Sequence, residues 1–131
     1  MDAKERKRIE KIAKNVRMWA VKNRGSFPPD LEGMCARAAG ELLYRLQRAK
    51  IKAEIAFKTF HAFVRYDGYV IDVTATQFGM SEVEIVPQKE AEKHYFWSNR
   101  DIDGTFSSPW TAARYQARVG WPDDQQIRVK G

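Results

Sequence analysis

The sequence predicts an α+β fold, in which helices come before and after a small antiparallel sheet. Apolar residues recur with a helical period over residues 4–23 and again over residues 35–50. Residues 51–78 are instead rich in β-branched and aromatic types, which favour strands. Asp67-Gly68 lies inside that segment and is the strongest hairpin signal in the chain.

Two helices are expected in the N-terminal part of the chain. The first covers residues 4–23 and is ended by Gly25 and Pro28. The second runs over residues 35–50 and contains Gly40, which costs about 1 kcal/mol relative to alanine and therefore indicates a close packing contact. Their apolar stripes are Ile9, Ile12, Ala13, Val16, Trp19 and Ala20 in the first helix, and Ala39, Leu42, Leu43, Leu46 and Ala49 in the second.

The sheet is expected to contain strands over residues 51–57, 60–66, 69–75 and 81–86. Pro87 ends the last of them. Asp67 and Gly68 both tolerate the positive φ of a type I′ turn, so a two-residue loop should join the second strand to the third.

The C-terminal part is expected to be helical and to finish in an extended tail. Residues 89–97 favour a short helix. Ser108 is a good N-cap and Pro109 suits the first helical position, so a last helix should begin there. Gly120 and Pro122 then end it.

Length and composition bound the class of protein. Residues 1–131 fit a single domain, and 44% hydrophobic residues is ordinary for a globular chain. The lone Cys35 excludes an internal disulfide and a zinc site of several cysteines. No apolar run is long enough to span a membrane, and the charged N-terminus lacks the apolar region of a secretory signal. We therefore expect a reduced, cytoplasmic protein with no membrane partner.

The net charge of +6 lies in one segment. Residues 1–24 hold nine bases and three acids, whereas the remaining residues hold 14 of each. This placement raises the alternative that the first helix binds nucleic acid or an acidic protein partner. The bases are interleaved with Glu5 and Glu10, and no nucleic-acid motif or glycine-rich phosphate loop appears. A nucleic-acid partner is therefore not favoured.

Cys35 is the first candidate for chemistry, because it follows Gly33-Met34 at the expected start of the second helix. A helix N-terminus presents free N–H groups and partial positive charge, which favour thiolate over thiol. A thiolate is the species that attacks a carbonyl carbon. The alternative is that Cys35 is a small, buried hydrophobic residue.

The Asp67-Gly68 hairpin should place a histidine beside a carboxylate. With a two-residue loop, His61 and Asp72 are diagonal neighbours on one face of the sheet, which they share with Phe63. The opposite, apolar face carries Ala62, Val64, Ile71, Val73 and Ala75. A three-residue loop would put His61 and Asp72 on opposite faces.

Cys35, His61 and Asp72 together are the parts of a triad for nucleophilic acyl transfer. The imidazole takes the thiol proton and later protonates the leaving amine, while the carboxylate orients the imidazole and stabilises its charge. Taken separately, His61 also fits a hydrogen-bonded core histidine, and Asp72 a strand-edge cap. A zinc site from the three residues is a weaker alternative, because no two stand at short ligand spacing. We expect no metal and no cofactor.

The order of these residues resembles the core of papain-like cysteine enzymes, in particular their transglutaminase-like branch. The matching segments, within about residues 30–80, are Gly33-Met34-Cys35 before an Ala/Leu-rich helix, His61-Ala62-Phe63-Val64 and Tyr69-Val70-Ile71-Asp72-Val73-Thr74. The resemblance implies a papain-like fold, with the helix that bears the nucleophile packed on a small antiparallel sheet. It also implies Cys35 as nucleophile, His61 as base and acid, and Asp72 as the orienting carboxylate.

Two features depart from papain itself. Residues 30–34 contain no glutamine for an oxyanion hole, and Ala36 rather than tryptophan follows the cysteine. The oxyanion hole would then use the Cys35 backbone N–H and a second donor. Gln77 is a candidate for this donor, with a plain surface amide as the alternative.

The expected function is a cysteine hydrolase or acyltransferase of the peptidase, deamidase or transglutaminase type. Its substrate would be a protein or peptide, and the basic helix would recruit an acidic substrate. The alternatives are a binding module that uses this helix, and a papain-like fold without activity.

His94 is expected in a packed aromatic patch. Trp97, Phe106 and Trp110 are expected in the core, with an acyl pocket as the alternative.

Overall fold

The computed structural model describes residues 1–95 and 99–130. Within these residues, five strands form one antiparallel sheet in the order β4-β3-β2-β1-β5. The strands are β1 (Glu54–Lys58), β2 (His61–Tyr66), β3 (Tyr69–Asp72), β4 (Glu84–Pro87) and β5 (Gly104–Phe106). The helices are α1 (Ala3–Lys22), α2 (Cys35–Arg48), α3 (Gln88–Tyr95) and α4 (Pro109–Val119), with 3₁₀ turns η1 (Ala75–Phe78), η2 (Asn99–Asp101) and η3 (Asp123–Gln125). The α+β class is confirmed.

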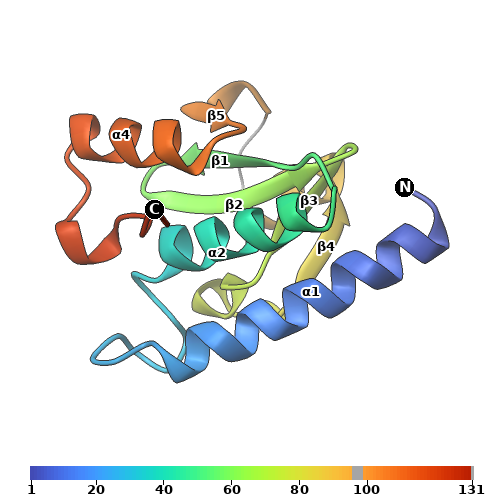
Figure 1. Cartoon of the computed structure of the whole chain (residues 1–131), viewed down its shortest axis with the longest axis horizontal. Helices are drawn as coiled ribbons and strands as arrows, with labels where there is room; N and C mark the ends of the chain where they lie inside the picture. Colours follow the sequence, from blue (N-terminus) through green and yellow to red (C-terminus); the bar gives the residue numbers. More distant parts are fainter. Residues whose placement is uncertain (96–98, 131) are drawn as a thin grey trace.

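Helices α1 and α2 lie on one side of the sheet. Figure 1 shows α2 along β2, with α1 beside α2. The main hydrophobic core includes Leu42 and Leu46 of α2 and Val64 of β2, all fully buried. A smaller cluster joins Phe63 to Ala91 of α3. Because successive side chains of β2 point to opposite faces, the sheet is covered by α2 on one face and by α3 on the other.

The two N-terminal helices form where the sequence predicts them. Asp2 caps α1, since its carboxylate accepts a hydrogen bond from the Glu5 N–H at 2.7 Å. Four stripe residues of α1 are fully buried, namely Ile9, Ala13, Val16 and Ala20. Ile12 and Trp19 are half-buried at the edge of this stripe.

Gly40 lies where the C-terminal tail passes over α2. A Cβ atom at this position would be 2.8 Å from Ile127 Cγ2, closer than real Cβ atoms approach a neighbour. The expected close packing contact is therefore confirmed, and its partner is the tail.

The Asp67-Gly68 hairpin has the expected two-residue loop. The β2–β3 pairs are Val64–Ile71, Arg65–Val70 and Tyr66–Tyr69. Asp67 and Gly68 have φ values of 50° and 78°, as the primed turn requires. β3 ends at Asp72 rather than at residue 75, because the Asp72 carboxylate accepts the Thr74 N–H and the chain continues into η1.

The first strand is shorter than expected, and the fifth was not predicted. β1 begins at Glu54 rather than at Ile51, whose N–H donates to the Leu46 carbonyl at 2.9 Å and so continues the helix end. β5 (Gly104–Phe106) pairs with the outer side of β1 and is too short to show an alternating pattern.

β4 is an edge strand and covers Glu84–Pro87 instead of residues 81–86. Pro87 is its last residue, which an edge position permits because proline donates no ladder hydrogen bond. α3 follows directly as Gln88–Tyr95, and the remainder of the expected helix over 89–97 lies outside the described residues.

The last helix is confirmed. α4 begins with Pro109 after Ser108, and Gly120 ends it with a φ of 87°.

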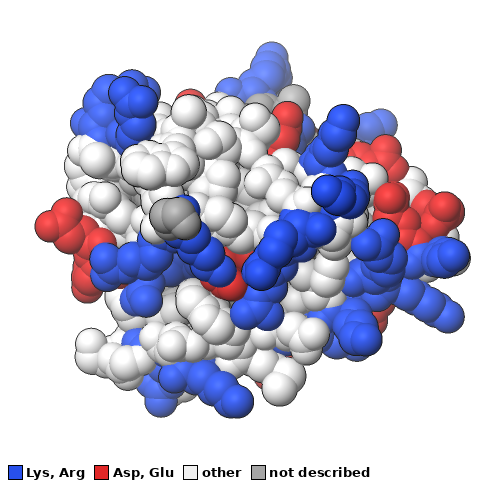
Figure 2. All heavy atoms as spheres, viewed as in Figure 1, with Lys and Arg blue, Asp and Glu red and all other residues white. Residues whose placement is uncertain are grey.

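None of the described helices combines the length and the apolar character that a membrane crossing needs. Figure 2 shows Lys and Arg side chains spread across one face of the molecule, with acidic side chains mainly near its margins.

Candidate active site

Cys35 is the first residue of α2, and its side chain is 3% exposed. The loop before it consists of successive turns, in which the Leu31 N–H donates to Pro28 and the Met34 N–H donates to Leu31, both at 2.9 Å. The Leu31 and Met34 side chains are fully buried and anchor this loop. Because Cys35 is the first residue of the helix, its backbone N–H has no backbone acceptor among the described residues.

Gly33 is required two residues before the cysteine. Its φ of 90° lies in the left-handed region that favours glycine, and a Cβ atom would be 2.9 Å from ring carbons of Phe27. The glycine therefore allows the tight turn from which α2 starts.

His61 is the first residue of β2 and follows a strained two-residue turn. Thr59 and Phe60 join β1 to β2 with φ values of 43° and 61°, which residues other than glycine rarely adopt. The Thr59 N–H donates to Asp103 Oδ2 at 2.7 Å and this bond holds the turn. Cys35 Sγ lies 3.6 Å from the Phe60 carbonyl oxygen, so the turn brings the start of β2 to the thiol.

His61 and Asp72 meet, as the hairpin register predicts. His61 Nε2 lies 2.8 Å from Asp72 Oδ2, and both side chains are buried. The Thr74 N–H and hydroxyl donate to Asp72 Oδ1 at 2.8 and 3.2 Å. The Tyr95 hydroxyl donates to Oδ2 at 2.7 Å. A carboxylate with this many donors keeps one orientation and stays ionised although it is buried.

The two buried groups stabilise each other as an ion pair. Burial disfavours the His61 imidazolium, but the Asp72 carboxylate outweighs this effect and, with Cys35 nearby, raises the pKa of His61 to about 10. Burial also opposes the charge on Asp72, but His61 and the hydrogen bonds from Tyr95 and Thr74 lower the pKa of this carboxyl. At neutral pH the pair is therefore imidazolium and carboxylate.

The second ring nitrogen of His61, Nδ1, is not used by Asp72. His61 Nδ1 is buried and has no hydrogen-bond partner among the described residues. Cys35 is close enough to raise the pKa of His61, although the two side chains form no well-aligned hydrogen bond. Catalytic hydrogen bonds are often long or poorly aligned before substrate binds. With Nε2 bound to Asp72, Nδ1 is the nitrogen that can exchange a proton with Sγ.

Aromatic rings enclose the His61 imidazole. Phe63 and Tyr95 stack on it with centroid distances of 5.9 and 5.7 Å, and Phe78 meets it edge-on at 4.8 Å. These contacts restrict the orientation of the ring. Phe78 of η1 is 49% exposed and Phe60 is 58% exposed, so the site has two apolar side chains at the surface.

Thr74 and Tyr95 belong to this site but were not predicted from the sequence. Thr74 follows Asp72 by two residues, which is the spacing of an Asx turn, so a local signal for its role existed. Tyr95 lies 23 residues beyond Asp72, and the packing of α3 on the sheet brings it there. No local pattern indicates that contact.

Gln77 does not stand as a free donor beside Cys35. Its amide donates to the Thr74 carbonyl at 3.1 Å and to the Thr74 hydroxyl at 3.3 Å, so it stabilises η1. In the part of the chain that the structure describes, no group of three or more His, Cys, Asp or Glu side chains is arranged to hold a metal ion.

The expectation for His94 was wrong. Its side chain is exposed, because α3 turns Ala91 and Tyr95 toward the sheet instead. Trp110 is 60% exposed, so its expected place in the core was also wrong. Phe106 is half-buried against Tyr115, with ring centroids 5.1 Å apart. Trp97 lies outside the described residues.

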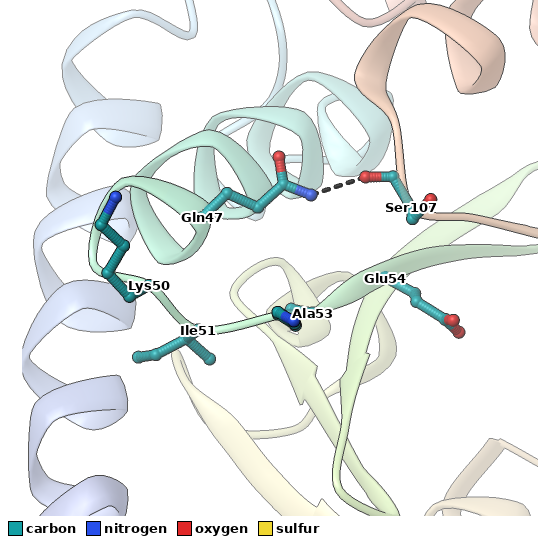
Figure 3. A pocket seen from close by; sticks show the side chains of 7 residues that line it. Gln47, Lys50, Ile51, Ala53, Glu54 and Ser107 are labelled. Carbon is teal, nitrogen blue, oxygen red and sulfur yellow. Dashed lines mark hydrogen bonds between the residues drawn. The ribbon is translucent and has the colours of Figure 1, made fainter.

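A cavity of about 420 Å³ lies at the other end of α2 from Cys35 (Figure 3). It is lined by Gln47, Lys50, Ile51, Lys52, Ala53, Glu54 and Ser107. The Gln47 amide donates to the Ser107 carbonyl across one side of it. None of Cys35, His61 and Asp72 lines this cavity.

No protein-family model matches the chain, and neither a curated protein nor a solved structure is significantly similar to it. The functional argument therefore depends on the geometry of Cys35, His61 and Asp72.

Proposed function

We propose that the chain is a papain-like, transglutaminase-like cysteine hydrolase or acyltransferase that acts on an amide carbonyl of a protein or peptide. The observation that carries this proposal is the 2.8 Å contact between His61 Nε2 and Asp72 Oδ2, with Cys35 beside the same imidazole at a helix start. A thiol, an imidazole and a carboxylate in this arrangement are the groups that nucleophilic acyl transfer requires. The proposed reaction uses no metal and no cofactor.

The first half of the reaction begins with a Cys35 thiolate and a His61 imidazolium. Sulfur attacks the carbonyl carbon, a C–S bond forms, and the Cys35 backbone N–H donates to the resulting oxyanion. His61 Nδ1–H then gives its proton to the amide nitrogen, the C–N bond breaks, and ammonia or an amine leaves. The acyl group remains on Cys35 as a thioester, and His61 is neutral.

Water or a primary amine completes the second half. His61 takes a proton from the attacking group, a C–O or C–N bond forms, and the C–S bond breaks. Cys35 returns to thiolate and His61 to imidazolium. Water yields a carboxylic acid, as in a peptidase or deamidase, whereas an amine yields a new amide, as in a transglutaminase. Throughout the reaction, the Asp72 carboxylate accepts a hydrogen bond from His61 Nε2–H and holds the ring in place.

The surroundings of the triad support this chemistry. His61 and Asp72 are 8% and 2% exposed, and electrostatic interactions act strongly between groups shielded from water. The exposed rings of Phe60 and Phe78 offer an apolar surface beside the reacting groups. A mechanism that needs a free thiol suits a reducing, cytoplasmic location.

Alkylation by iodoacetamide tests the proposal. We expect Cys35 to react rapidly near neutral pH, and His61→Ala to slow the reaction by about tenfold or more, because the thiolate loses its imidazolium partner. His94→Ala is the matched control, since His94 is exposed and should leave the rate unchanged. Circular dichroism verifies that each variant folds. A thiol that reacts only after unfolding contradicts the proposal and favours a papain-like fold without activity.

A further inference from the structure

The arginines of the N-terminal segment differ in their contacts from two of its lysines. Every arginine in residues 1–24 donates to a backbone carbonyl: Arg6 to Ile85 (2.9 Å), Arg8 to Ala49 (2.9 Å), Arg17 to Val73 (3.1 Å) and Arg24 to Phe27 (2.6 Å). Lys7 and Lys11 are exposed and form no ion pair or hydrogen bond within residues 1–95 and 99–130. The arginines therefore hold the fold, while these lysines are not needed for it.

Lys7 and Lys11 belong to a row of side chains on one face of α1. Lys7, Lys11, Lys14 and Met18 are spaced by four, three and four residues, which places them in one row along a helix. Lys14 pairs with Glu10 at 3.0 Å. Met18 is 59% exposed, so the row of lysines ends in an apolar side chain that faces solvent.

This face is hollowed along its length. One groove of about 520 Å³ is lined by Lys7, Glu10, Lys11, Lys14, Asn15 and Met18. A second groove of about 670 Å³ is lined by Lys14, Arg17, Met18, Thr76, Met80, Ser81, Glu82 and Val83. The two share Lys14 and Met18 and therefore adjoin: the first runs along α1 alone, and the second lies between α1 and the segment that joins η1 to β4. We call the two together the α1 groove.

We propose that the α1 groove binds an acidic peptide segment that also carries apolar side chains. Lys7 and Lys11 match carboxylates by charge, and Met18 and Met80 match apolar side chains in the same groove. An extended peptide presents both kinds of side chain at short intervals, as this mixed lining requires. The occupant is therefore a protein segment.

A nucleic-acid backbone fits the α1 groove less well. Met18, Met80 and Val83 line it and would gain no contact from phosphates, whereas the apolar side chains of a peptide would pack on them. A groove for a phosphate backbone would instead be lined by bases throughout its length. RNA binding is therefore the contrary outcome in the test below.

The α1 groove and the candidate active site share η1. Arg17 ties α1 to this turn by donating to Thr76 Oγ1 at 2.8 Å, and Phe78 of the same turn contacts His61. A segment bound in the groove thus lies against the element that borders the imidazole. Binding itself needs none of Cys35, His61 or Asp72, so this inference does not rest on the proposed function.

Fluorescence anisotropy tests the inference with a labelled peptide of alternating glutamate and leucine, titrated with the Cys35→Ala protein so that no turnover occurs. We expect the Lys7→Glu/Lys11→Glu variant to bind about tenfold more weakly, because two exposed charge contacts become repulsive. The matched control is Lys89→Glu/Lys93→Glu, which reverses two exposed lysines on α3 and should bind as Cys35→Ala does. Met18→Ser should weaken binding without changing its dependence on salt.

Three outcomes overturn the inference: no binding at low salt, equal weakening by both double variants, or tighter binding of an RNA oligonucleotide than of the peptide. Circular dichroism of Lys7→Glu/Lys11→Glu excludes unfolding as the cause of a loss. Since anisotropy reads binding alone, failure here leaves the reactivity of Cys35 as a separate question.

Discussion

The His61 imidazole and the Asp72 carboxylate form a buried ion pair, 2.8 Å apart, on neighbouring strands joined by a two-residue turn. The turn sets the register, and a shift of one residue would send the two side chains to opposite faces of the sheet. The pair is thus a direct consequence of the Asp67-Gly68 loop, and the contact with Cys35 then depends on how α2 begins.

The ion pair predicts how stability changes with pH. The pKa of His61 rises from 6.5 to about 10 on folding, so its contribution is complete below pH 6.5 and is lost as pH rises toward 10. In urea denaturation across this range, the free energy of unfolding should fall more steeply for the wild type than for His61→Gln. The pKa of Asp72 is lowered, so its contribution is lost in acid, below the usual range of aspartate. Equal slopes for the two proteins between pH 6.5 and 10 would show that the pair is absent.

Replacing Asp72 by asparagine removes the charge and keeps the shape. Burial then disfavours the imidazolium with no carboxylate to offset it, so alkylation of Cys35 at neutral pH should slow by about tenfold or more. Glu84→Gln is the control. Glu84 lies opposite Asp72 in the register of β3 and β4, but within the described residues its side chain forms no hydrogen bond with His61. If the two variants react with iodoacetamide at the same rate, Asp72 does not orient the imidazole.

Tyr95 is expected to act as a positioning residue through its bond to Asp72. Tyr95→Phe removes a hydrogen bond to a charged group, which should cost about 1.5–3 kcal/mol of unfolding free energy. It should also shift the acid limb of the Cys35 alkylation profile to higher pH, because Tyr95 helps to keep the pKa of Asp72 low. Tyr66→Phe, which loses a 3.0 Å bond to Glu5, should leave that profile unchanged. A profile unchanged in both variants would limit Tyr95 to a structural role.

Gly40→Ala should destabilise the fold through the C-terminal tail. The added methyl group would lie 2.8 Å from Ile127 Cγ2, and such overpacking costs about 1–3 kcal/mol. Ile127→Ala makes room for it, so the double variant should lose less stability than the sum of the two single variants. Urea denaturation of the four proteins measures this coupling, and strict additivity would mean that the two residues do not touch.

The elements that local chemistry determines were predictable. The helical periods of α1 and α2, the Asp67-Gly68 turn and the Ser108-Pro109 helix start all appear in the sequence where the structure has them. β5 had no comparable signal, since three residues show no alternation and its place beside β1 depends on tertiary packing. Residues 73–75 have the composition of a strand, but the Asp72 side chain competes for the Thr74 N–H and ends β3 early.

In the candidate site, Cys35, His61 and Asp72 were predictable from the sequence, and the residues that support them were less so. The positive φ values of Thr59 and Phe60 could not be anticipated, because neither residue favours that region and the bond that holds the turn comes from Asp103, 44 residues away. The helical period of α3 is enough to predict that His94 is exposed. Ala91 and Tyr95 are four residues apart and face inward, which leaves His94 toward solvent.

Formation of an acyl-enzyme tests the central claim most directly. After incubation with a peptide p-nitrophenyl ester, intact-mass spectrometry of the wild type should show one added acyl group, located on Cys35 and removed by hydroxylamine as a thioester is. Cys35→Ala should show none, His61→Ala much less, and His94→Ala as much as the wild type. A wild-type protein that gains no acyl group, or an equal yield in His61→Ala, would contradict the account.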